Sequence, residues 1–462
     1  MRKYDVAIVG AGPGGYVAAI RLGQLGKKVA LIERDKIGGV CLNYGCIPTK
    51  AIIHVAYLFK KIKWLREVGL EIQEVKLDFK KIQQWKNSVL ERLRKGINYL
   101  LNSYSVEIFK GNASFEDHNK LNVKESGEEI YAENIIVATG SLPSELPNIK
   151  IDGRYVIDST FALELEEIPK DIIIIGGGAI GLEFGCAFQN FGSNVYVVEI
   201  MDQLLPGFDK ELSETLRRIM ERRGAKIFLN STVSEISISN DKIKAILNTK
   251  TGVVELEADK ILLSIGRKPN TEGLNIENTK ILRNNKGFII TDEYQRTNIS
   301  NIYAIGDITG PPFLAHRASK QGIIAAEIIS GLKSAFDYRA IPSVYFTDPE
   351  IVSVGLSQEE ASKNREILIG KFPFLALGRA LAYGSSEGFV KVIADKKTNM
   401  ILGIQAIGEG VSDLSGEAAL AIEMGATLED LSFVMHPHPT LTESIMEAAE
   451  NALKKAIHIL NK

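Results

Sequence analysis

Two segments of the chain repeat the same order of apolar and polar positions. Residues 4–33 begin with a continuous apolar run, pass through a glycine-rich turn and a predicted helix, and end in a second apolar run. Residues 171–199 repeat this order. Unbroken apolar strands are typical of parallel sheets that are covered on both faces. Each segment is therefore predicted to fold as a strand, a helix and a second parallel strand.

The turn after each first strand carries the spacing G-x-G-x-x-G. The motif glycines are Gly10, Gly12 and Gly15 in the first copy and Gly176, Gly178 and Gly181 in the second. The first glycine permits a tight turn, the second lets a pyrophosphate approach the backbone, and the third lets helix and strand pack closely. An acid ends each second strand, Glu33 and Glu199, where it can accept hydrogen bonds from a ribose.

One such motif is weak evidence, but two copies with the same glycine-to-acid spacing predict two dinucleotide sites. The alternative is that both units need glycine only for packing, which leaves the two glutamates unexplained. Residues 200–206, which follow Glu199, contain no Arg or Lys. Because a carboxylate would repel a 2′-phosphate, we expect NAD(H) rather than NADP(H) at the second site.

The pattern predicts an α/β chain with two doubly wound, Rossmann-like dinucleotide-binding domains and an α+β domain at the C-terminus. The expected domains are residues 1–150 with 271–340, residues 151–270, and residues 341–462. Strands at 366–374 and 388–408 predict an antiparallel sheet in the last domain. Helices at 412–426 and 443–460 are expected to cover that sheet.

Composition argues against several functional classes. The chain has 462 residues and a formal net charge of −2, so no positive field predicts binding to nucleic acid or to an acidic membrane surface. No uninterrupted apolar stretch reaches the roughly 18 residues of a membrane span, and the first residues are predicted to form a strand and not a signal peptide. Three cysteines favour a reducing compartment, and we expect the cytoplasm.

Two of the cysteines, Cys41 and Cys46, lie within residues 38–50. Pro48 is typical of a first helical turn, so both sulfurs are expected near a helix N-terminus, where a thiolate is stabilised. Their short spacing suits a disulfide that opens and closes and adds little stability. Ordinary core cysteines or half of a zinc site are alternatives, but no second pair follows, and no metal site is expected. Cys186 is predicted to be a small buried residue.

The stretch from His436 to Glu443 offers a base and an acid. Thr440 and Glu443 fit a capping box with Thr440 as the N-cap. In one interpretation, capping the helix is the whole role of Glu443. Alternatively, one carboxylate oxygen caps the helix while the other accepts a hydrogen bond from His438. His436 and His438 would point in opposite directions on an extended chain, which disfavours a two-histidine metal site.

Glu183 lies on an otherwise apolar predicted helix. A buried carboxylate is costly unless it is paired, so a cationic partner is expected, and Lys50 is the candidate. Exposure of Glu183 to solvent is the alternative.

Residues 38–50 resemble the redox-disulfide segment of the flavin-dependent pyridine nucleotide–disulfide oxidoreductases. Four other segments resemble parts of that family's FAD domain: Gly111–Ala113, Ile135–Ser141, Asn301–Gly310 and Leu314–Ala318. The resemblance covers essentially the whole chain and implies that the first glycine motif binds FAD and the second NAD. Further FAD contacts are implied at Lys50, Ala113, Thr139, Gly140, Asp307 and Ala315, and further NAD contacts at Val233 and Gly266.

Within that family, residues 436–449 resemble the histidine–glutamate segment of the dihydrolipoyl dehydrogenases. The resemblance implies oxidation of dihydrolipoamide to lipoamide with reduction of NAD+ to NADH. It implies that Cys41 exchanges with the substrate and that Cys46 passes electrons to the flavin. By the same resemblance, His438 is the acid/base that Glu443 orients, and Lys50, paired with Glu183, lies near flavin N5.

The resemblance also implies a homodimer, because the family's histidine comes from the partner subunit. The expected partners are dihydrolipoyl groups on acyltransferases or on a glycine-cleavage carrier protein. Two alternatives stay open: another FAD- and NAD(P)H-dependent disulfide reductase of the family, or a flavoprotein that docks on or regulates a multienzyme complex.

Overall fold

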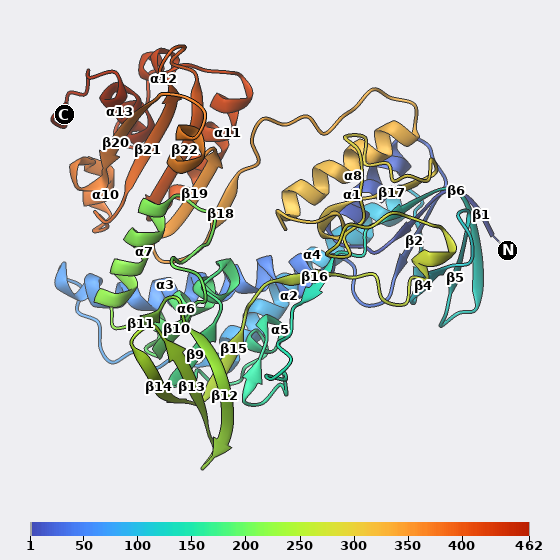
Figure 1. The fold of residues 1–462 in the computed structure, drawn as a ribbon, viewed down its shortest axis with the longest axis horizontal. Helices are drawn as coiled ribbons and strands as arrows, with labels where there is room; N and C mark the ends of the chain where they lie inside the picture. Colours follow the sequence, from blue (N-terminus) through green and yellow to red (C-terminus); the bar gives the residue numbers. More distant parts are fainter. Residues whose placement is uncertain (1, 462) are drawn as a thin grey trace. The chain divides into compact units, whose positions relative to one another are not determined.

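A computed structural model describes residues 2–461, and the chain divides into two compact units (Figure 1). The first unit comprises the chain up to Ala51, Lys80–Ser144 and Gly266–Asp337. The second comprises Ile52–Phe79, Glu145–Ile265 and the chain from Tyr338 onward. The structure is mixed α/β, as predicted.

The first unit is built around the first repeat. It folds as β1 (Arg2–Val9), α1 (Pro13–Gln24) and β2 (Val29–Glu33), and β1 and β2 are parallel with Val6 opposite Val29. Their sheet has the order β3-β2-β1-β6-β5-β4, with β17 beside β6. The added strands are β3 (Glu107–Lys110), β4 (Ala113–Phe115), β5 (Lys120–Val123), β6 (Glu128–Val137) and β17 (Ile302–Ala304). The last four residues of β1 are buried, as a strand covered on both faces requires.

Helix α8 (Ala315–Ile329) packs beside α1 in this unit (Figure 1). A Cβ at Gly322 of α8 would lie only 2.5 Å from the Gly14 carbonyl oxygen, so glycine is what permits this close approach. The unit also contains α2 (Gly39–Tyr44), α4 (Phe79–Ser103), and a small antiparallel pair of β7 (Ser141–Pro143) and β16 (Arg267–Pro269). Helix α3 (Cys46–Glu67) starts in the first unit and ends in the second.

The second repeat forms β9 (Asp171–Ile175), α6 (Ala179–Phe191) and β10 (Asn194–Val198) in the second unit. Its parallel sheet has the order β11-β10-β9-β15-β8. The remaining elements of this part are β8 (Val156–Ile157), α5 (Ser159–Ala162), α7 (Lys210–Arg222), β11 (Lys226–Phe228) and β15 (Lys260–Leu263), with a meander of β12 (Thr232–Ser239), β13 (Lys242–Thr249) and β14 (Gly252–Ala258). Both repeats therefore adopt the predicted strand–helix–strand fold.

The C-terminal part of the second unit contains the predicted antiparallel sheet, in the order β18-β19-β22-β21-β20. Its elements are β18 (Ser343–Tyr345), β19 (Glu350–Gly355), α9 (Gln358–Ser362), β20 (Ile367–Pro373), α10 (Gly378–Ala382), β21 (Phe389–Asp395), β22 (Ile401–Gly408), α11 (Ser415–Glu423), α12 (Leu428–Phe433) and α13 (Glu443–Ala452). Helices α11 and α13 lie against this sheet (Figure 1), and apolar side chains of the sheet and of both helices form one core.

Helix α13 is shorter than the predicted 443–460. It stops at Ala452, and Lys454 takes a positive φ of 60°, which ends helical geometry. The following residues fold back on the helix, where His458 Nδ1 lies 2.5 Å from Glu447 Oε1. Among residues 2–461, no helix combines the length and the apolar character that crossing a membrane demands.

Candidate active site

The cysteine segment lies directly against the first glycine motif in the first unit. Cys41 is on α2 and Cys46 is the first residue of α3, so Cys46 stands at the predicted helix N-terminus. The Gly38 N–H donates to the Ala11 carbonyl oxygen at 2.8 Å. A Cβ at Gly39 would lie 2.5 Å from the Gly12 Cα, and Gly39 has a φ of +58°. The fold therefore places the thiols beside the turn that is predicted to hold a pyrophosphate.

Cys41 and Cys46 form a hydrogen-bonded dithiol, and within residues 2–461 no disulfide joins the cysteines. The hydrogen bond with Cys46 is the main cause of a strongly raised pKa at Cys41, and burial and the charge of Cys46 act in the same direction. The positive charge of Lys50 acts in the opposite direction. Cys41 therefore keeps its proton unless a base removes it.

The two predicted ribose-binding acids make the same hydrogen bonds in both repeats. Glu33 accepts from the Ala11 N–H at 2.7 Å and from the Asp35 N–H at 2.9 Å. Glu199 accepts from the Gly177 N–H at 2.6 Å and from the Met201 N–H at 2.8 Å. Each carboxylate thus ties the glycine turn to the end of the second strand. A second lone pair on each oxygen can accept from a ribose hydroxyl.

The glycine turns leave space for a ligand. A Cβ at Gly178 would meet no atom within 4 Å, and one at Gly12 would meet only the Gly39 Cα at 4.0 Å. By contrast, a Cβ at Gly15 would lie 1.8 Å from the Gly10 carbonyl oxygen, and one at Gly181 would lie 2.3 Å from that of Gly176. The middle glycine of each motif therefore faces open space, while the third permits close packing. Both turns fit a dinucleotide pyrophosphate.

The other residues predicted to bind FAD lie in the first unit as well. The predicted FAD segment Ile135–Ser141 abuts the first glycine motif, because a Cβ at Gly10 would lie 2.4 Å from the Ala138 carbonyl oxygen. Thr139 Oγ1 donates to the Asn270 carbonyl oxygen at 2.8 Å. Gly140 has a φ of +71°, Ala113 begins β4, and Ala315 begins α8.

Asp307 is held by Ser141, and Ser141 is held in turn by Arg267, a residue that the sequence did not single out. Ser141 Oγ donates to Asp307 Oδ2 at 2.5 Å, and Arg267 Nε donates to Ser141 Oγ at 2.6 Å. Arg267 lies 126 residues from Ser141 along the chain, and no local spacing in the sequence points to this contact.

Most of the residues predicted to bind NAD lie in the second unit. Val233 is buried on β12, and a Cβ at Gly176 would lie 2.4 Å from the Ser264 carbonyl oxygen. Ser264, which the sequence did not indicate, also donates through Oγ to Ile175 and Gly176 at 3.1 and 3.2 Å. Gly266 has a φ of +117° but belongs to the first unit, so its role in binding NAD stays a prediction.

His438 and Glu443 are brought together as expected. His438 Nδ1 lies 2.8 Å from Glu443 Oε1, and the Thr440 N–H donates to Glu443 Oε2 at 2.7 Å. Burial acts to raise the pKa of Glu443, but the Thr440 N–H and the His438 imidazole outweigh it, so the net shift is downward. Glu443 therefore bonds both the chain before the helix and the imidazole.

The predicted N-cap is wrong by two residues. Helix α13 begins at Glu443 with Thr442 as its N-cap. Thr440 Oγ1 donates to the Pro437 carbonyl oxygen at 2.7 Å, so it supports the preceding turn rather than the helix. His436 is bonded elsewhere, with Nε2 2.8 Å from Glu417 Oε1. The two histidines thus have separate acidic partners.

Glu183 is buried on α6 in the second unit, which excludes the solvent-exposed alternative. Its Oε1 accepts from the Phe346 N–H at 3.0 Å. Lys50 belongs to the first unit, so the pairing of these two charges stays a prediction. Cys186 is fully buried on the same helix, and burial raises its pKa to about 12, in agreement with an inert core residue.

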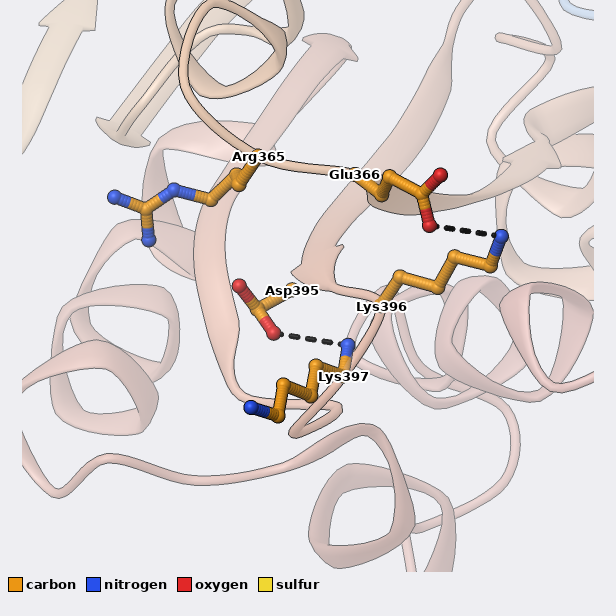
Figure 2. A pocket seen from close by; sticks show the side chains of 5 residues that line it. All are labelled: Arg365, Glu366, Asp395, Lys396 and Lys397. Carbon is orange, nitrogen blue, oxygen red and sulfur yellow. Dashed lines mark hydrogen bonds and ion pairs between the residues drawn. The ribbon is translucent and has the colours of Figure 1, made fainter.

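A surface pocket at the β20–β21 end of the C-terminal sheet contains none of the predicted site residues (Figure 2). It is lined by Arg365, Glu366, Asp395, Lys396 and Lys397. Glu366 pairs with Lys396 at 3.1 Å, and Asp395 accepts from the Lys397 N–H at 2.9 Å. Within residues 2–461, no group of three or more His, Cys, Asp or Glu side chains is placed to hold a metal ion.

Comparisons with known proteins agree with this geometry. Residues 4–322 match the family described as pyridine nucleotide-disulphide oxidoreductase, and residues 341–449 match its dimerisation domain. The chain is 44% identical to the dihydrolipoyl dehydrogenase of Geobacillus stearothermophilus, over 99% of this chain and 98% of the relative. It is 43% identical to that of Thermus scotoductus, over the full length of both chains.

Solved structures show the same fold. The HOCl-induced flavoprotein disulfide reductase RclA from Escherichia coli, solved as a Cu(II) complex, superposes with a TM-score of 0.88 at 30% identity, over 97% of this chain and 99% of that one. LpdA from Mycobacterium tuberculosis gives a TM-score of 0.89 at 27% identity, with the same coverage.

Proposed function

The chain belongs to the pyridine nucleotide-disulphide oxidoreductases, and from that premise we propose that it oxidises protein-bound dihydrolipoyl groups to lipoyl groups and reduces NAD+ to NADH. The observation that carries the proposal is the hydrogen-bonded pair Cys41–Cys46 packed against the first glycine turn. It supports a two-electron thiol relay beside the turn that fits a dinucleotide.

The chemistry starts from the oxidised pair. A substrate thiolate attacks the Cys41 sulfur, the bond to Cys46 breaks, and a mixed disulfide forms. The second substrate thiolate then displaces Cys41 and closes the lipoyl disulfide. The two electrons and the two protons of the substrate dithiol stay on the enzyme, where Cys41 and Cys46 are left as a dithiol. Bound FAD would supply the two-electron acceptor that links the dithiol to NAD+, and forming NADH from the dithiol would release one proton.

His438 supplies the base that this exchange needs. Thiols attack as thiolates and are mostly protonated near neutral pH. With Nδ1–H bonded to Glu443, the Nε2 lone pair is available to take a substrate proton. The match of residues 341–449 to the dimerisation domain supports a homodimer. The imidazole is 77% exposed, and we place it opposite the cysteine pair of the partner subunit.

Lys50 is proposed to stabilise negative charge on the flavin, with Glu183 as its counter-ion. Its positive charge already acts on Cys41, which supports its placement in the thiol site. The residues that would hold FAD are Gly10, Gly12, Gly15, Glu33, Ala113, Thr139, Gly140, Asp307 and Ala315. Those that would hold NAD are Gly176, Gly178, Gly181, Glu199, Val233 and Gly266. The proposed partners are lipoyl groups on acyltransferases or a glycine-cleavage carrier, and the proposed location is the cytoplasm.

Formation of NADH from dihydrolipoamide and NAD+ by the purified holoenzyme tests the function. We expect turnover by the wild type and none by a variant with alanine at both Cys41 and Cys46. Turnover by an isolated protein also separates a catalyst from a docking or regulatory component. NADH formation that survives both substitutions would reject the relay.

A further inference from the structure

Asp348 is a largely shielded acid, 13% exposed, that contacts α3, α6 and the residue after α7 in the second unit. Its Oδ2 accepts from Lys60 Nζ of α3 at 2.6 Å and from Asn190 Nδ2 of α6 at 2.7 Å. Its Oδ1 lies 3.2 Å from Nη1 of Arg223, the residue that follows α7. The same Arg223 nitrogen donates to the Asp348 carbonyl oxygen at 2.8 Å. We name these four residues the Asp348 clamp.

The clamp is a charged network largely removed from water. Burial acts to raise the pKa of Asp348, but Arg223, Lys60 and Asn190 outweigh it, so the net shift is downward and the carboxylate is ionised near neutral pH. Burial lowers the pKa of Lys60, against the pull of Asp348. Removing one partner from such a network leaves buried charge uncompensated, which loosens the site strongly.

The chain segment that carries Asp348 also holds Glu183. The Phe346 N–H donates to Glu183 Oε1 at 3.0 Å, two residues before Asp348. Glu183 and Asn190 lie seven residues apart on α6, which is about two helical turns. Residues 346–348 are therefore fastened to α6 at two points on one side of the helix, one through Glu183 and one through the clamp.

We propose that Asp348 is a positioning residue for the reaction: it holds residues 346–348 on α6, so that the Phe346 N–H fixes the direction of the Glu183 carboxylate. This role rests on the proposed function, in which Glu183 is the counter-ion of Lys50 beside the flavin. The Lys60 contact adds a link to α3, the helix whose first residue is Cys46.

The buried Cys186 gives a test of the clamp that needs no catalysis. It lies on α6 three residues after Glu183, and both the backbone and the charge of Asp348 act on the pKa of its thiol. The chain has three cysteines, so replacing Cys41 and Cys46 by serine leaves Cys186 as the single thiol. We expect Asp348→Asn to speed alkylation of Cys186 by iodoacetamide about tenfold or more, through local opening.

Glu409→Gln is the matched control for this measurement. Glu409 pairs with Lys61 of α3 at 2.8 Å and accepts from the Tyr57 hydroxyl, also on α3. This variant breaks a comparable tie to α3 without touching α6, and it should leave the Cys186 rate unchanged. An unchanged rate in Asp348→Asn, or equal acceleration in both variants, would overturn the clamp. Lys60→Gln, which removes one of the three side-chain contacts, is the second variant if Asp348→Asn does not fold.

The link to Glu183 is tested in holoenzyme with its native cysteines, through the reduction potential of the bound flavin. We expect Asp348→Asn to shift the potential in the same direction as Glu183→Gln, and the double variant to match Glu183→Gln alone. Asp348 would have only a structural role if Asp348→Asn left the flavin potential unchanged. The same conclusion would follow if the shifts of the two single variants added up in the double variant. Failure of the wild-type holoenzyme to form NADH from dihydrolipoamide would instead refute the proposed function, and the Cys186 result would still decide the clamp.

Discussion

His438 and Glu443 form a hydrogen-bonded pair in which the imidazole is exposed and the carboxylate is shielded. Nδ1 lies 2.8 Å from Oε1, and the side chains are 77% and 16% exposed, respectively. The other oxygen of Glu443 accepts a hydrogen bond from the Thr440 N–H, so the orientation of the carboxylate does not depend on the imidazole alone. The pair therefore favours the tautomer of His438 that carries the proton on Nδ1, which leaves the Nε2 lone pair available on an exposed ring.

Replacing His438 by Gln should remove the base and leave the cofactor sites intact. General-base assistance contributes roughly 10²–10⁴-fold, so oxidation of dihydrolipoamide should fall by about that factor. Reduction of an artificial acceptor by NADH needs no thiol base and should stay within about twofold of wild type, since no step that His438 serves is involved. Both rates are measured on one preparation with matched flavin content. Equal losses in the two assays would contradict the assignment.

Glu443 should make stability depend on pH in the acid range. Its pKa is lowered in the folded chain, so its contribution is complete above the ordinary glutamate pKa of about 4.3 and is lost as the pH falls through the lower folded value. Urea unfolding between pH 6 and pH 3, run as a series of ~0.5 pH steps, would show a shallower decline for Glu443→Gln than for wild type. Glu366→Gln, at an exposed position, is the control and should parallel the wild type. Parallel curves for Glu443→Gln would contradict this role.

Local patterns in the sequence were enough to predict both glycine repeats and the antiparallel sheet, whereas the pairing of His438 with Glu443 was one of two interpretations, which the family resemblance decided. Each depends on residues close together in the chain or on a repeated spacing. Arg267 and Ser264 were missed because their contacts, with Ser141 and with Gly176, join segments about 90 to 130 residues apart. Contacts between segments so far apart produce no periodic pattern in the sequence from which they could be predicted.

Helix ends were predicted least well. The apolar spacing of residues 453–460 favoured a longer last helix, but the chain turns at Lys454 and His458 returns to bond Glu447. The Thr440 and Glu443 spacing predicted a capping box, but the Thr440 hydroxyl bonds Pro437 instead. In both cases a tertiary or turn contact outweighed the local preference. The roles assigned to individual site residues, and the domain boundaries, stay predictions.

Cys46→Ala should make Cys41 more acidic. The hydrogen bond with Cys46 is the largest cause of the raised pKa at Cys41, so removing that sulfur should move the midpoint of Cys41 alkylation to lower pH. Lys50→Met should move the midpoint in the opposite direction, because the lysine charge favours the thiolate. Iodoacetamide rates across a pH series, with the modified peptide identified by mass, give both midpoints. If both variants moved the midpoint of Cys41 alkylation in the same direction, Cys46 and Lys50 would not have opposite effects on the pKa of Cys41.

The nicotinamide site should prefer NADH over NADPH. Glu199 lies at the turn, and Ile200 and Met201 follow it with exposed apolar side chains that offer no charge to a 2′-phosphate. We expect kcat/KM to be higher for NADH by about tenfold or more, since a like-charge contact costs several kcal/mol. Glu199→Gln keeps an acceptor for the Gly177 N–H and removes the charge. It should therefore lower the KM for NADPH and so bring the kcat/KM values for NADH and NADPH closer together. Comparable kcat/KM values in the wild type would reject the preference.

Disturbing the buried ion pair Lys391–Asp209 should lower the free energy of unfolding more than disturbing an exposed ion pair does. Lys391 Nζ lies 2.7 Å from Asp209 Oδ1, and the two side chains are 2% and 0% exposed. Asp209 also caps α7 by accepting from the Glu211 N–H at 3.1 Å. Lys391→Met leaves this carboxylate buried without its cation, which should lower the free energy of unfolding by about 3–5 kcal/mol. Lys396→Met breaks the exposed pair with Glu366, whose side chains are 56% and 82% exposed, and should cost about 0–1 kcal/mol.

A double variant separates lost charge balance from lost packing. Asp209→Asn keeps an oxygen for the α7 cap and removes the negative charge, so combining it with Lys391→Met should recover part of the stability that Lys391→Met loses. Urea denaturation of the four proteins, with Lys396→Met alongside, gives each free energy. If the double variant loses as much free energy of unfolding as the two single variants lose together, the attraction between the two charges does not stabilise the pair. If Lys391→Met costs no more than Lys396→Met, burial of the pair has no energetic consequence, and α7 is anchored to the C-terminal sheet by other contacts.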